Sequence, residues 1–600
     1  MRLKRTLYIG ELNNNFIGKE VIVSGWVLRR RDHGGVIFID LRDRTGLLQI
    51  VFEEGIDPKI HDLANSIRIE YVISVKGLIR KRPPGMENPK IPTGEIELVA
   101  TDVEILNTSK TPPFPMDEDL SEVSEAIRLK YRYLEMRALN GLNPFIFRHK
   151  VNQTIRKFLD NKGFLEIETP FLTKSTPEGA RDYLVPSRLY PGKFYALPQS
   201  PQLFKQILMI AGIDKYYQIV KCFRDEDLRA DRQPEFTQLD IEMSFVDEND
   251  IMDIIEELLA YLFKETLNIT LETPFPKLSY ETALRDYGTD RPDIRFDMKL
   301  KDLSYLFKDT SFKVFRNTLE SGGIIKGLKA PANFSRKELD DLTKFAQELG
   351  AKGLAWIKYD KNANSFEKKW SSPIVKFFEK SVLEKLEEIF NPLEEFATFF
   401  FVADKEDIVN FILSELRNHL AKKLGLIPEN KFSFVWIIDF PLFEWDEEEN
   451  RLVSVHHPFT HPKEEDISFL ETDPLKVKSR AYDIVLNGVE IGGGSIRIHK
   501  RELQEKIFKL LNISPEEAQE KFGFLLTALE YGAPPHGGIA FGLDRLIMLM
   551  LGKKSIREVI PFPKTQRAQC LLTGAPSEVR IEQILELHLL PGWEKKKEKS

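Results

Sequence analysis

The sequence predicts a multidomain α+β protein: an N-terminal five-stranded β-barrel, a larger domain built on an antiparallel sheet, and an α+β domain inserted into the larger one. Three observations predict this arrangement. Residues 20–106 have the pattern of several short strands. Two charged strand motifs lie far apart, at 223–242 and 537–545, and a helical Lys/Glu-rich stretch separates them. At 600 residues the chain is too long for one core, so three or four domains are expected.

Composition limits the class of protein. Hydrophobic residues make up 42 % of the chain and charged residues 30 %, which is typical of a globular, soluble protein. Two cysteines, Cys222 and Cys570, are too few for a disulfide scaffold or a cysteine-ligated zinc site, so no zinc is expected. No apolar run reaches the roughly 20 residues of a membrane span, and the N-terminus lacks a signal-peptide core. We therefore expect a cytoplasmic protein with no membrane partner.

The N-terminal region is typical of an OB barrel. Strands are expected at 21–30, 36–42, 47–52, 70–80 and 95–105, with a helix at 57–67 after the third strand. The net charge of −7 means that any RNA contact must come from a local patch. One face offers cations, a ring and hydrogen-bonding groups that suit splayed single-stranded bases: Arg29, Arg30, Arg31, Phe38, Gln49 and Glu97. A solvated Arg-rich edge strand is the alternative.

The segments after the barrel are less specific. Thr111-Pro-Pro-Phe-Pro115 and the acidic stretch behind it predict a linker. Asn143 and Pro144 start an apolar-faced helix that ends at Gly163, and a strand is expected at 164–169. Residues 288–428 alternate helical segments, such as 335–349 and 382–389, with short apolar strands, which indicates an inserted α+β domain.

The segment 223–240 predicts two strands joined by a charged loop. On the returning strand, one face carries Phe236, Gln238, Asp240 and Glu242. On the outgoing strand Arg224 and Glu226 also share a face, so a cation, an acceptor and a ring can converge on a nucleotide. A solvated charged hairpin is the alternative.

A second motif, Gly537-Gly-Ile-Ala-Phe-Gly-Leu-Asp-Arg545, leads from a glycine-rich strand into an apolar helix at 546–551. Glycines there let a ligand approach the backbone closely. Arg545 at the mouth of this element suits a phosphate, because an unpaired guanidinium in the core would be costly. The alternative is an Arg that extends into solvent from the helix start.

A metal site is predicted from a hairpin. Asn487-Gly488 is a strong two-residue turn signal, which would pair Leu486 with Val489, Val485 with Glu490 and Asp483 with Gly492. Asp483 and Glu490 are then diagonal neighbours whose carboxylates could hold one Mg²⁺; two exposed acids are the alternative. A regular strand would turn Arg497 to the opposite face from Glu490, so we expect a bulge within 492–494.

Segments 223–240 and 537–545 resemble the second and third signature motifs of class II aminoacyl-tRNA synthetases. Together with Gln199-Ser-Pro-Gln-Leu-Phe-Lys205 and Glu490-Ile-Gly-Gly-Gly-Ser-Ile-Arg497, they make the chain similar to the bacterial aspartyl-tRNA synthetase branch, over nearly its whole length. The resemblance implies that L-aspartate is joined to tRNA through aspartyl-adenylate, with ATP as substrate, Mg²⁺ as cofactor and a homodimer as the assembly. The chain has no G-x-x-x-x-G-K-[ST] phosphate loop, which fits a nucleotide site on antiparallel strands.

The resemblance also implies roles for particular residues. Arg224 and Arg545 are the expected catalytic residues. Aspartate binding is expected at Glu178, Ser200, Gln202, Lys205, Arg224, Asp240, His456 and Arg497. ATP binding is expected at Arg224, Asp225, Glu226, Gln233, Phe236, Glu490, Gly542, Leu543, Asp544 and Arg545. Metal binding is expected at Asp483 and Glu490, and anticodon binding at Arg31, Phe38, Gln49 and Glu97.

The domain boundaries are expected from this resemblance together with the pattern of elements along the chain. We expect an OB-fold anticodon-binding domain at 1–108, a linker at 109–138, a first catalytic part at 139–287, the inserted domain at 288–428, a second catalytic part at 429–565 and a C-terminal extension at 566–600. Segment 175–180 resembles the family loop that closes over the amino acid.

The specificity for tRNA and for the amino acid is open to more than one interpretation. His33 and Gly85 match the markers of the relaxed form, which charges both tRNA(Asp) and tRNA(Asn); a strictly discriminating enzyme is the alternative. An asparaginyl enzyme is a more distant one, because an amide uses the cations Lys205 and Arg497 less well than a carboxylate does. A non-catalytic RNA-binding protein of the same fold would be expected to lack Arg224, Glu490 or Arg545, and all three are present.

Overall fold

The computed structural model describes residues 1–55, 57–176, 180–228 and 231–590. The chain divides into two compact units, each described by itself below. Unit 1 comprises Met1–His149, Leu228–Gln233 and Lys553–Val579, and unit 2 comprises Lys150–Asp227, Pro234–Gly552 and Arg580–Ser600. Among the helices that the structure describes, none is long and apolar enough to cross a membrane.

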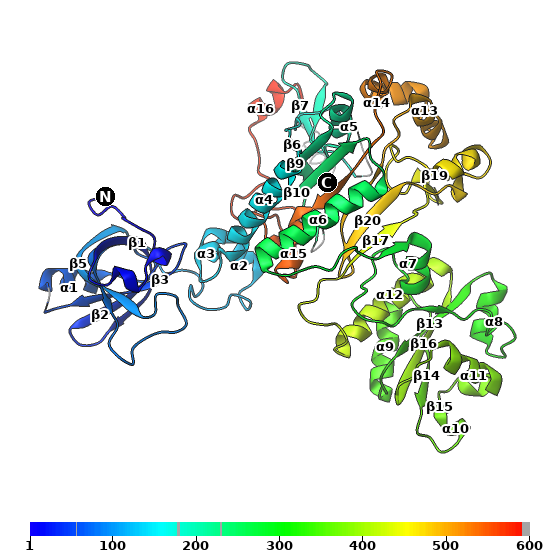
Figure 1. Cartoon of the computed structure of the whole chain (residues 1–600), viewed down its shortest axis with the longest axis horizontal. Coiled ribbons are helices and arrows are strands. Elements are labelled where there is room, and N and C mark those ends of the chain that lie inside the picture. The colour runs from blue at the N-terminus through cyan, green and yellow to red at the C-terminus, as the bar shows by residue number, and fades with distance from the viewer. Residues whose placement is uncertain (56, 177–179, 229–230, 591–600) are drawn as a thin grey trace, which may run out of the picture. The chain divides into compact units, whose positions relative to one another are not determined.

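Unit 1 begins with a closed five-stranded barrel in the order β1-β2-β3-β5-β4 (Figure 1). Its elements are β1 (Glu20–Asp32), β2 (Val36–Arg42), β3 (Leu47–Glu53), α1 (Pro58–Ser66), β4 (Val72–Lys81) and β5 (Ile96–Asn107). The alternating apolar residues of all five strands fill its interior, which confirms the OB barrel. The helix pair α2 (Glu125–Lys130) and α3 (Arg132–Arg137) follows.

Glu70 corrects the expected start of the fourth strand. The strand begins at Val72, because Glu70 adopts a left-handed φ of 65° and its carboxylate is buried against two arginines. Arg42 donates to it at 2.8 Å, and Arg137 lies 2.9 Å away. A buried charge of this kind is stable only when it is paired.

Unit 2 is built on an eight-stranded sheet in the order β11-β17-β20-β21-β22-β10-β9-β6. The strands are β11 (Lys277–Ser279), β17 (Phe434–Ile438), β20 (Ala481–Leu486), β21 (Val489–Ile496), β22 (His536–Gly542), β10 (Glu235–Ser244), β9 (Lys215–Phe223) and β6 (Leu165–Glu166). The central pairs are antiparallel as expected, and the two edge pairs, β11 with β17 and β6 with β9, are parallel.

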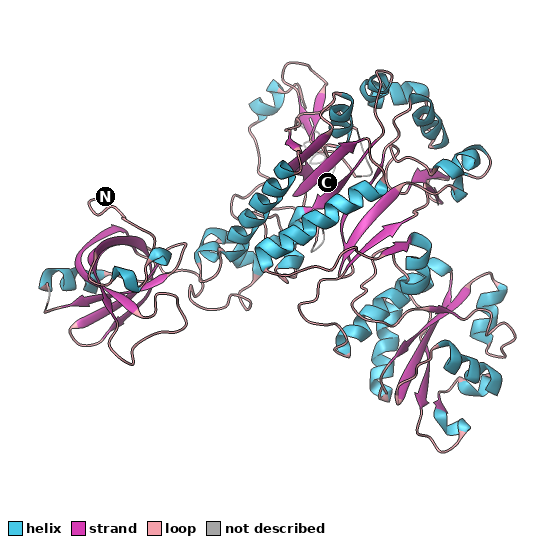
Figure 2. Ribbon diagram, viewed as in Figure 1, coloured by secondary structure: helices cyan, strands magenta, loops and turns pink. Residues whose placement is uncertain are grey.

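Helices pack along this sheet. Figure 2 shows the long helices α4 (Asn143–Asn161) and α6 (Glu248–Leu267) side by side, and the rings of Phe158 and Tyr261 join them at 5.6 Å. The remaining helices of this part are α5 (Gln202–Ile210), α7 (Tyr280–Tyr287), α13 (Arg501–Leu510), α14 (Pro515–Leu529), α15 (Leu543–Met550) and α16 (Ile581–Glu586). Two small hairpins, β7 (Leu184–Pro186) with β8 (Phe194–Ala196) and β18 (Phe443–Asp446) with β19 (Arg451–Ser454), complete it.

The stretch 288–428 holds a separate five-stranded sheet in the order β12-β13-β16-β14-β15. Its elements are β12 (Lys301–Asp302), α8 (Lys313–Glu320), β13 (Ile324–Ala330), α9 (Arg336–Glu348), β14 (Ala355–Asp360), α10 (Phe366–Lys369), β15 (Trp370–Ser371), α11 (Lys380–Ile389), β16 (Phe396–Asp404) and α12 (Glu406–Lys423). Phe399 and Phe401 belong to one core and Phe400 to the other, so both faces of the sheet are covered. The expected domain boundaries stay predictions.

Candidate active site

The working residues of the large sheet share one face, here called the charged face. Strand pairing aligns Asp240 with Ala540, Gly493 and Asp483, and Glu242 with Gly538 and Ser495. Small residues leave room for the carboxylates. A Cβ at Gly538 would lie 2.1 Å from Glu242 Oε2, and one at Gly493 would lie 2.4 Å from Asp483 Oδ1. The glycines are therefore needed because the acids of neighbouring strands lie directly over them.

Two cations and two carboxylates are buried together on this face. Lys205 Nζ, from α5, donates to Asp240 Oδ1 at 2.9 Å and lies 3.3 Å from Glu242 Oε2. Arg497 donates to both oxygens of Glu242, at 2.9 and 3.2 Å. All four residues are at most 1 % exposed. Charged side chains that are this deeply buried are stable only when they are paired, so the four residues form one ion-pair network.

The two carboxylates of this cluster differ in proton affinity. Burial raises the pKa of Glu242, but Arg497 and Lys205 outweigh burial and lower it. Burial dominates for Asp240 and raises its pKa, although Lys205 opposes the shift. Among the described residues, Asp240 Oδ2 is buried without a hydrogen-bond partner. It is an acceptor that a donor group of a ligand could satisfy.

The pKa values of two adjacent histidines are shifted in opposite directions. His457 Nε2 accepts from Arg497 Nη1 at 2.8 Å, and burial together with Arg497 holds the pKa of His457 well below its usual value. His456 Nε2 lies 3.3 Å from Asp483 Oδ1. Burial lowers the pKa of His456, but Asp483 outweighs burial and the net shift is upward. His456 was expected to contact the bound amino acid. In the structure its imidazole contacts Asp483, one of the two candidate metal ligands.

The β20–β21 hairpin corrects the expected register. Leu486 pairs with Val489 and Val485 with Glu490 as expected, but Asp483 pairs with Gly493 and not with Gly492. A bulge adds Ile491 to β21, one residue before the range in which it was expected. The extra residue turns Glu490 and Arg497 to the same face. The bulge therefore brings the acidic pair and the cationic cluster together.

The acidic pair suits a magnesium ion. Burial and the neighbouring Asp483 raise the pKa of Glu490, so a cation between the two carboxylates would relieve their repulsion. Their oxygen donors match the preference of Mg²⁺, which often keeps waters and bridges substrate phosphates. In the described ranges, no group of three or more His, Cys, Asp or Glu side chains is arranged to hold a metal.

Arginines stand at the nucleotide end of the face. The Arg224 guanidinium carbon lies 5.0 Å from the centre of the Phe236 ring. Arg545, in α15, donates from Nη1 to the carbonyl oxygen of Glu490 at 2.7 Å. Asp544 Oδ2 accepts the amide N–H of Thr237 at 2.7 Å, which fastens the start of α15 to β10. Arg545 is thereby held beside the acidic pair.

Comparison with known proteins identifies the family. Residues 124–566 match the family described as tRNA synthetases class II (D, K and N), and residues 21–106 match the OB-fold nucleic acid binding domain. The chain belongs to this class II tRNA synthetase family. It is 59 % identical over 599 residues to aspartate–tRNA(Asp/Asn) ligase of Aquifex aeolicus, covering 98 % of each chain. It is 56 % identical to the ligase of the same name from Thermodesulfovibrio yellowstonii, covering 98 % of this chain and 99 % of that one.

Solved structures show the same fold at low sequence identity. Asparaginyl-tRNA synthetase from Pyrococcus horikoshii, complexed with asparaginyl-adenylate, superposes with a TM-score of 0.58 at 19 % identity, covering 94 % of this chain and 98 % of that one. Asparaginyl-tRNA synthetase from Entamoeba histolytica gives 0.57 at 17 %, covering 91 % and 95 %. These likenesses concern the fold alone.

The other expected site residues of this class II synthetase fall in different places. Ser200 Oγ accepts a hydrogen bond from the backbone N–H of Gln202 at 3.3 Å. The buried side chain of Gln202 donates to that of Gln206. Gly542 pairs with Gln238, and Leu543 is the first residue of α15. Half-buried Asp225 and Glu226 follow Arg224. Arg181 Nε donates to the backbone carbonyl oxygen of Asp225 at 3.4 Å and lies 3.7 Å from its carboxylate. Gln233 belongs to unit 1, where it bonds the backbone of Lys564 at 2.7 and 3.0 Å. Glu178 lies outside the described residues, as does most of the expected loop at 175–180.

The barrel of the synthetase brings the expected anticodon residues together. Arg31 donates to Asp40 at 2.8 Å and to Gln49 at 3.2 Å. Gln49 donates to Glu97 at 2.8 Å, and Arg80 donates to the same carboxylate at 2.7 Å. Phe38 is the strand partner of Arg31, and its ring meets His33 edge-on at 5.9 Å. Gly85 lies in the β4–β5 connection at a φ of 84°.

Sequence reasoning missed several members of these clusters. Glu242 was placed on the face of Asp240 but was given no role. Asp40 was detectable, because period-two alternation puts it on the face of Phe38. His457 and Ser495 carried no local signal. Their contacts with Arg497 depend on chain segments that meet only in the folded sheet.

Proposed function

We propose that this synthetase joins L-aspartate to tRNA with ATP through aspartyl-adenylate, and that it charges both tRNA(Asp) and tRNA(Asn). The relatives at 56–59 % identity bear the name aspartate–tRNA(Asp/Asn) ligase, which supports this proposal. The observation that carries it is the buried cluster of Lys205, Arg497, Asp240 and Glu242 next to the acidic pair.

Aspartate selection follows from the charges of this cluster. The substrate carries two carboxylates and one ammonium group. Arg497 is held rigid by Glu242, His457 and Ser495, so its guanidinium is oriented in advance for the side-chain carboxylate. Lys205 adds a second cation, and the unpartnered Asp240 Oδ2 suits the ammonium. An asparagine amide would gain less from two cations. Ser200, Gln202, Glu178 and His456 remain predicted members of this pocket.

The chemistry needs no nucleophilic side chain. An α-carboxylate oxygen of aspartate attacks the α-phosphorus of ATP and pyrophosphate leaves; a ribose hydroxyl of the terminal tRNA adenosine then attacks the carbonyl carbon and AMP leaves. Arg224 would hold the α-phosphate and the attacking carboxylate, Arg545 the γ-phosphate and Phe236 the adenine ring. Mg²⁺ on Asp483 and Glu490 would neutralise charge on the phosphate oxygens. Asp225, Glu226, Gln233, Gly542, Leu543 and Asp544 remain predicted ATP contacts.

The tRNA would be read by the barrel. The chain of contacts from Arg31 through Gln49 and Glu97 to Arg80 presents fixed donors and acceptors beside the Phe38 ring, which supports binding of unstacked bases. His33 lies against that ring. Its imidazole has one nitrogen that can donate a hydrogen bond and one that can accept one, so it could pair with the edge of either base. Recognition of tRNA(Asn), a role for Gly85, and a homodimer are part of this proposal.

Two measurements test the proposal in order. Aspartate-dependent pyrophosphate exchange should occur without tRNA, while exchange with asparagine should be far weaker. Charging is then measured with tRNA transcripts that differ only at the third anticodon base. Charging of both transcripts supports relaxed specificity, and charging of the aspartate transcript alone supports a strictly discriminating enzyme. Exchange with asparagine alone, or no exchange at all, contradicts the aspartate assignment.

A further inference from the structure

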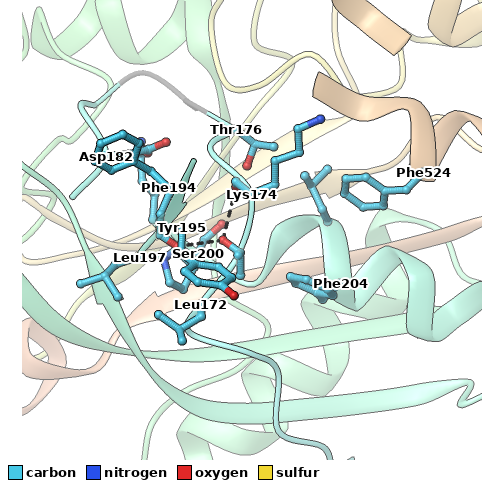
Figure 3. Close-up of a pocket in the computed structure, with 15 residues that line it drawn as sticks. Leu172, Lys174, Thr176, Asp182, Phe194, Tyr195, Leu197, Ser200, Phe204 and Phe524 are labelled. Atoms are coloured by element: carbon cyan, nitrogen blue, oxygen red, sulfur yellow. Dashed lines mark hydrogen bonds between the residues drawn. The ribbon is translucent and has the colours of Figure 1, made fainter. Parts of the chain in front are cut away.

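A cavity of about 480 Å³ lies beside α5 in unit 2. Figure 3 shows it between the β7–β8 hairpin, α5 and α14. Its walls are mainly aromatic: Phe194 and Tyr195 come from β8, Phe204 from α5 and Phe524 from α14. The side chains of Lys174 and Asp182 also line it. This volume is in the range of small-ligand pockets, and no step proposed above uses it.

Helix α5 separates this cavity from the charged face. Lys205 points to Asp240 on one side of the helix, while Leu203 and Phe204 line the cavity on the other. Ser200, two residues before α5, lines the cavity and is also an expected aspartate-binding residue, so the two spaces would meet there. A flexible molecule could therefore place one group on the charged face and the neighbouring group in the cavity.

The cavity offers ring faces and few charges. Phe194, Tyr195 and Phe524 are 42 %, 40 % and 43 % exposed, which is unusual for large rings that have a core available. Lys174 is its exposed cation, and its Nζ contacts the carbonyl oxygen of Glu520. One cation among apolar walls does not suit a triphosphate or the two carboxylates of aspartate. Flat aromatic walls suit a nucleobase, because every base has a π-face that stacks.

Asp182 adds a preference for a base that carries an amine. Its carboxylate accepts from Ser175 Oγ at 2.8 Å and from Gln199 Nε2 at 2.5 Å. A carboxylate has about four acceptor positions, so it could accept another hydrogen bond. Cytosine donates such a bond from its N4 amine, and acidic side chains are a recognised partner for that group.

We propose that this cavity binds a cytosine of the unpaired CCA end of tRNA while the terminal adenosine reaches the charged face. The proposal rests on the proposed function, because it assigns a place to a neighbour of the reacting nucleotide. Tyr195 and Phe524 stack the base, Asp182 accepts from its amine, and Lys174 lies beside its phosphate.

The test uses two truncations on different elements, Tyr195→Ala and Phe524→Ala, in the full-length enzyme. The matched control is Phe411→Ala, which removes a ring that is 51 % exposed on α12, within the separate inserted sheet domain. Each cavity variant should raise the KM for tRNA about tenfold, or about 1.4 kcal/mol, which lies within the range of a lost stack. Aspartate-dependent pyrophosphate exchange without tRNA should stay within twofold of wild type for all three variants.

Direct readouts locate the base. A tRNA carrying fluorescent pyrrolocytosine at either cytosine of its CCA end should lose fluorescence on binding wild type at one of the two positions, and lose less on binding Tyr195→Ala. Lys174→Gln should reduce the slope of log affinity against log salt by about 0.7, the contribution of one single-strand phosphate contact.

Several outcomes would overturn this assignment alone. They are an unchanged KM for tRNA in both cavity variants, a similar rise in the Phe411→Ala control, or equal fluorescence in wild type and Tyr195→Ala at both cytosines. A loss of exchange without tRNA in the cavity variants would assign the cavity to the amino acid instead. Absence of exchange in the wild-type enzyme would refute the proposed function itself.

Discussion

At the scale of single residues, the active site depends on charges that hold one another. Glu242 lies between Lys205 and Arg497 and is fully buried, so its ionised form exists only because both cations contact it. Arg497 in turn depends on Glu242 for its orientation. A residue that touches no substrate in the proposed chemistry therefore controls one that does.

Glu242→Gln tests this dependence. Because the neutral amide leaves Arg497 without its charged partner, the KM for aspartate should rise at least about tenfold while the KM for ATP changes less than threefold. The control is Glu248→Gln, which breaks the partly exposed Arg480–Glu248 pair at 2.6 Å in the same unit. Steady-state kinetics and a thermal melt are measured for both variants. Equal loss for aspartate and ATP would assign Glu242 to the fold only.

Arg224→Ala tests the nucleotide end. Removal of one preorganised charge contact should slow adenylate formation about 10²-fold, or about 2.7 kcal/mol, with the melting temperature unchanged. Arg181→Ala is the control, because its side chain is 76 % exposed and pairs with the neighbouring Asp225. Pyrophosphate exchange within a few-fold of wild type would remove Arg224 from the proposed mechanism.

At the scale of elements, the bulge in β21 and the glycines beside it decide which side chains meet. Alternation predicted the charged face of β10, and the Asn487-Gly488 turn predicted the first two hairpin pairs. The glycine run led us to expect the bulge within 492–494, whereas the extra residue in the structure is Ile491. The pairing of Arg497 with Glu242 was not predictable, because it requires the non-consecutive strand order β21-β22-β10.

Gly493→Ala tests the close approach at the acidic pair. The new Cβ would lie 2.4 Å from Asp483 Oδ1, so the carboxylate has to move away from Glu490. We expect the Mg²⁺ concentration that gives half-maximal exchange to rise at least about fivefold. Gly353→Ala is the control, because a Cβ there meets nothing within 4 Å. An unchanged Mg²⁺ dependence would separate Asp483 from metal binding.

At the scale of the whole molecule, the two units carry different expected tasks. The strands of the barrel were predictable to within one or two residues, except at Glu70, where a buried charge set the backbone. Two helices of the inserted domain were also predicted, at 335–349 and 382–389, and they correspond to α9 and α11. Its five-strand order was not, because strand order depends on contacts between distant segments.

Phe38→Ala in the barrel tests this division of labour. Loss of a stacking ring should weaken tRNA binding by about 1–3 kcal/mol, which raises the KM for tRNA, while pyrophosphate exchange without tRNA stays normal. In parallel, His33→Leu should lower charging of the asparagine tRNA more than that of the aspartate tRNA, measured as the ratio of kcat/KM. Impaired exchange in Phe38→Ala, or an unchanged ratio in His33→Leu, would contradict the assignment of these residues.

Acid should destabilise unit 2 through its histidines. Burial is the main cause that lowers the pKa of five of them from 6.5: His419, His457, His461, His499 and His536. The unfolded chain therefore binds more protons than the folded one below pH 6.5, so the stability present above that pH is lost as the pH falls. His456, whose pKa is raised, opposes the trend.

Thermal melts between pH 7.5 and 5.5 measure this effect. The melting temperature should fall across this range, and His499→Gln should make the fall shallower, because one proton-binding site is removed from the unfolded chain. A melting temperature that is independent of pH would contradict the prediction.

The bulge at Ile491 also limits how the gene for this strand can vary. Loss of that single codon would keep the reading frame and every charged residue, and it would remove the bulge as well. A regular strand would remain in which Glu490 and Arg497, then six residues apart, still share one face with Asp483. Substitutions along β21 change one side chain at a time, whereas a one-codon insertion or deletion in a regular strand inverts half of that strand unless a bulge forms or is lost with it. Active lineages should therefore keep a bulge in this strand wherever the positions of Glu490 and Arg497 lie seven residues apart, and have a regular strand wherever they lie six apart.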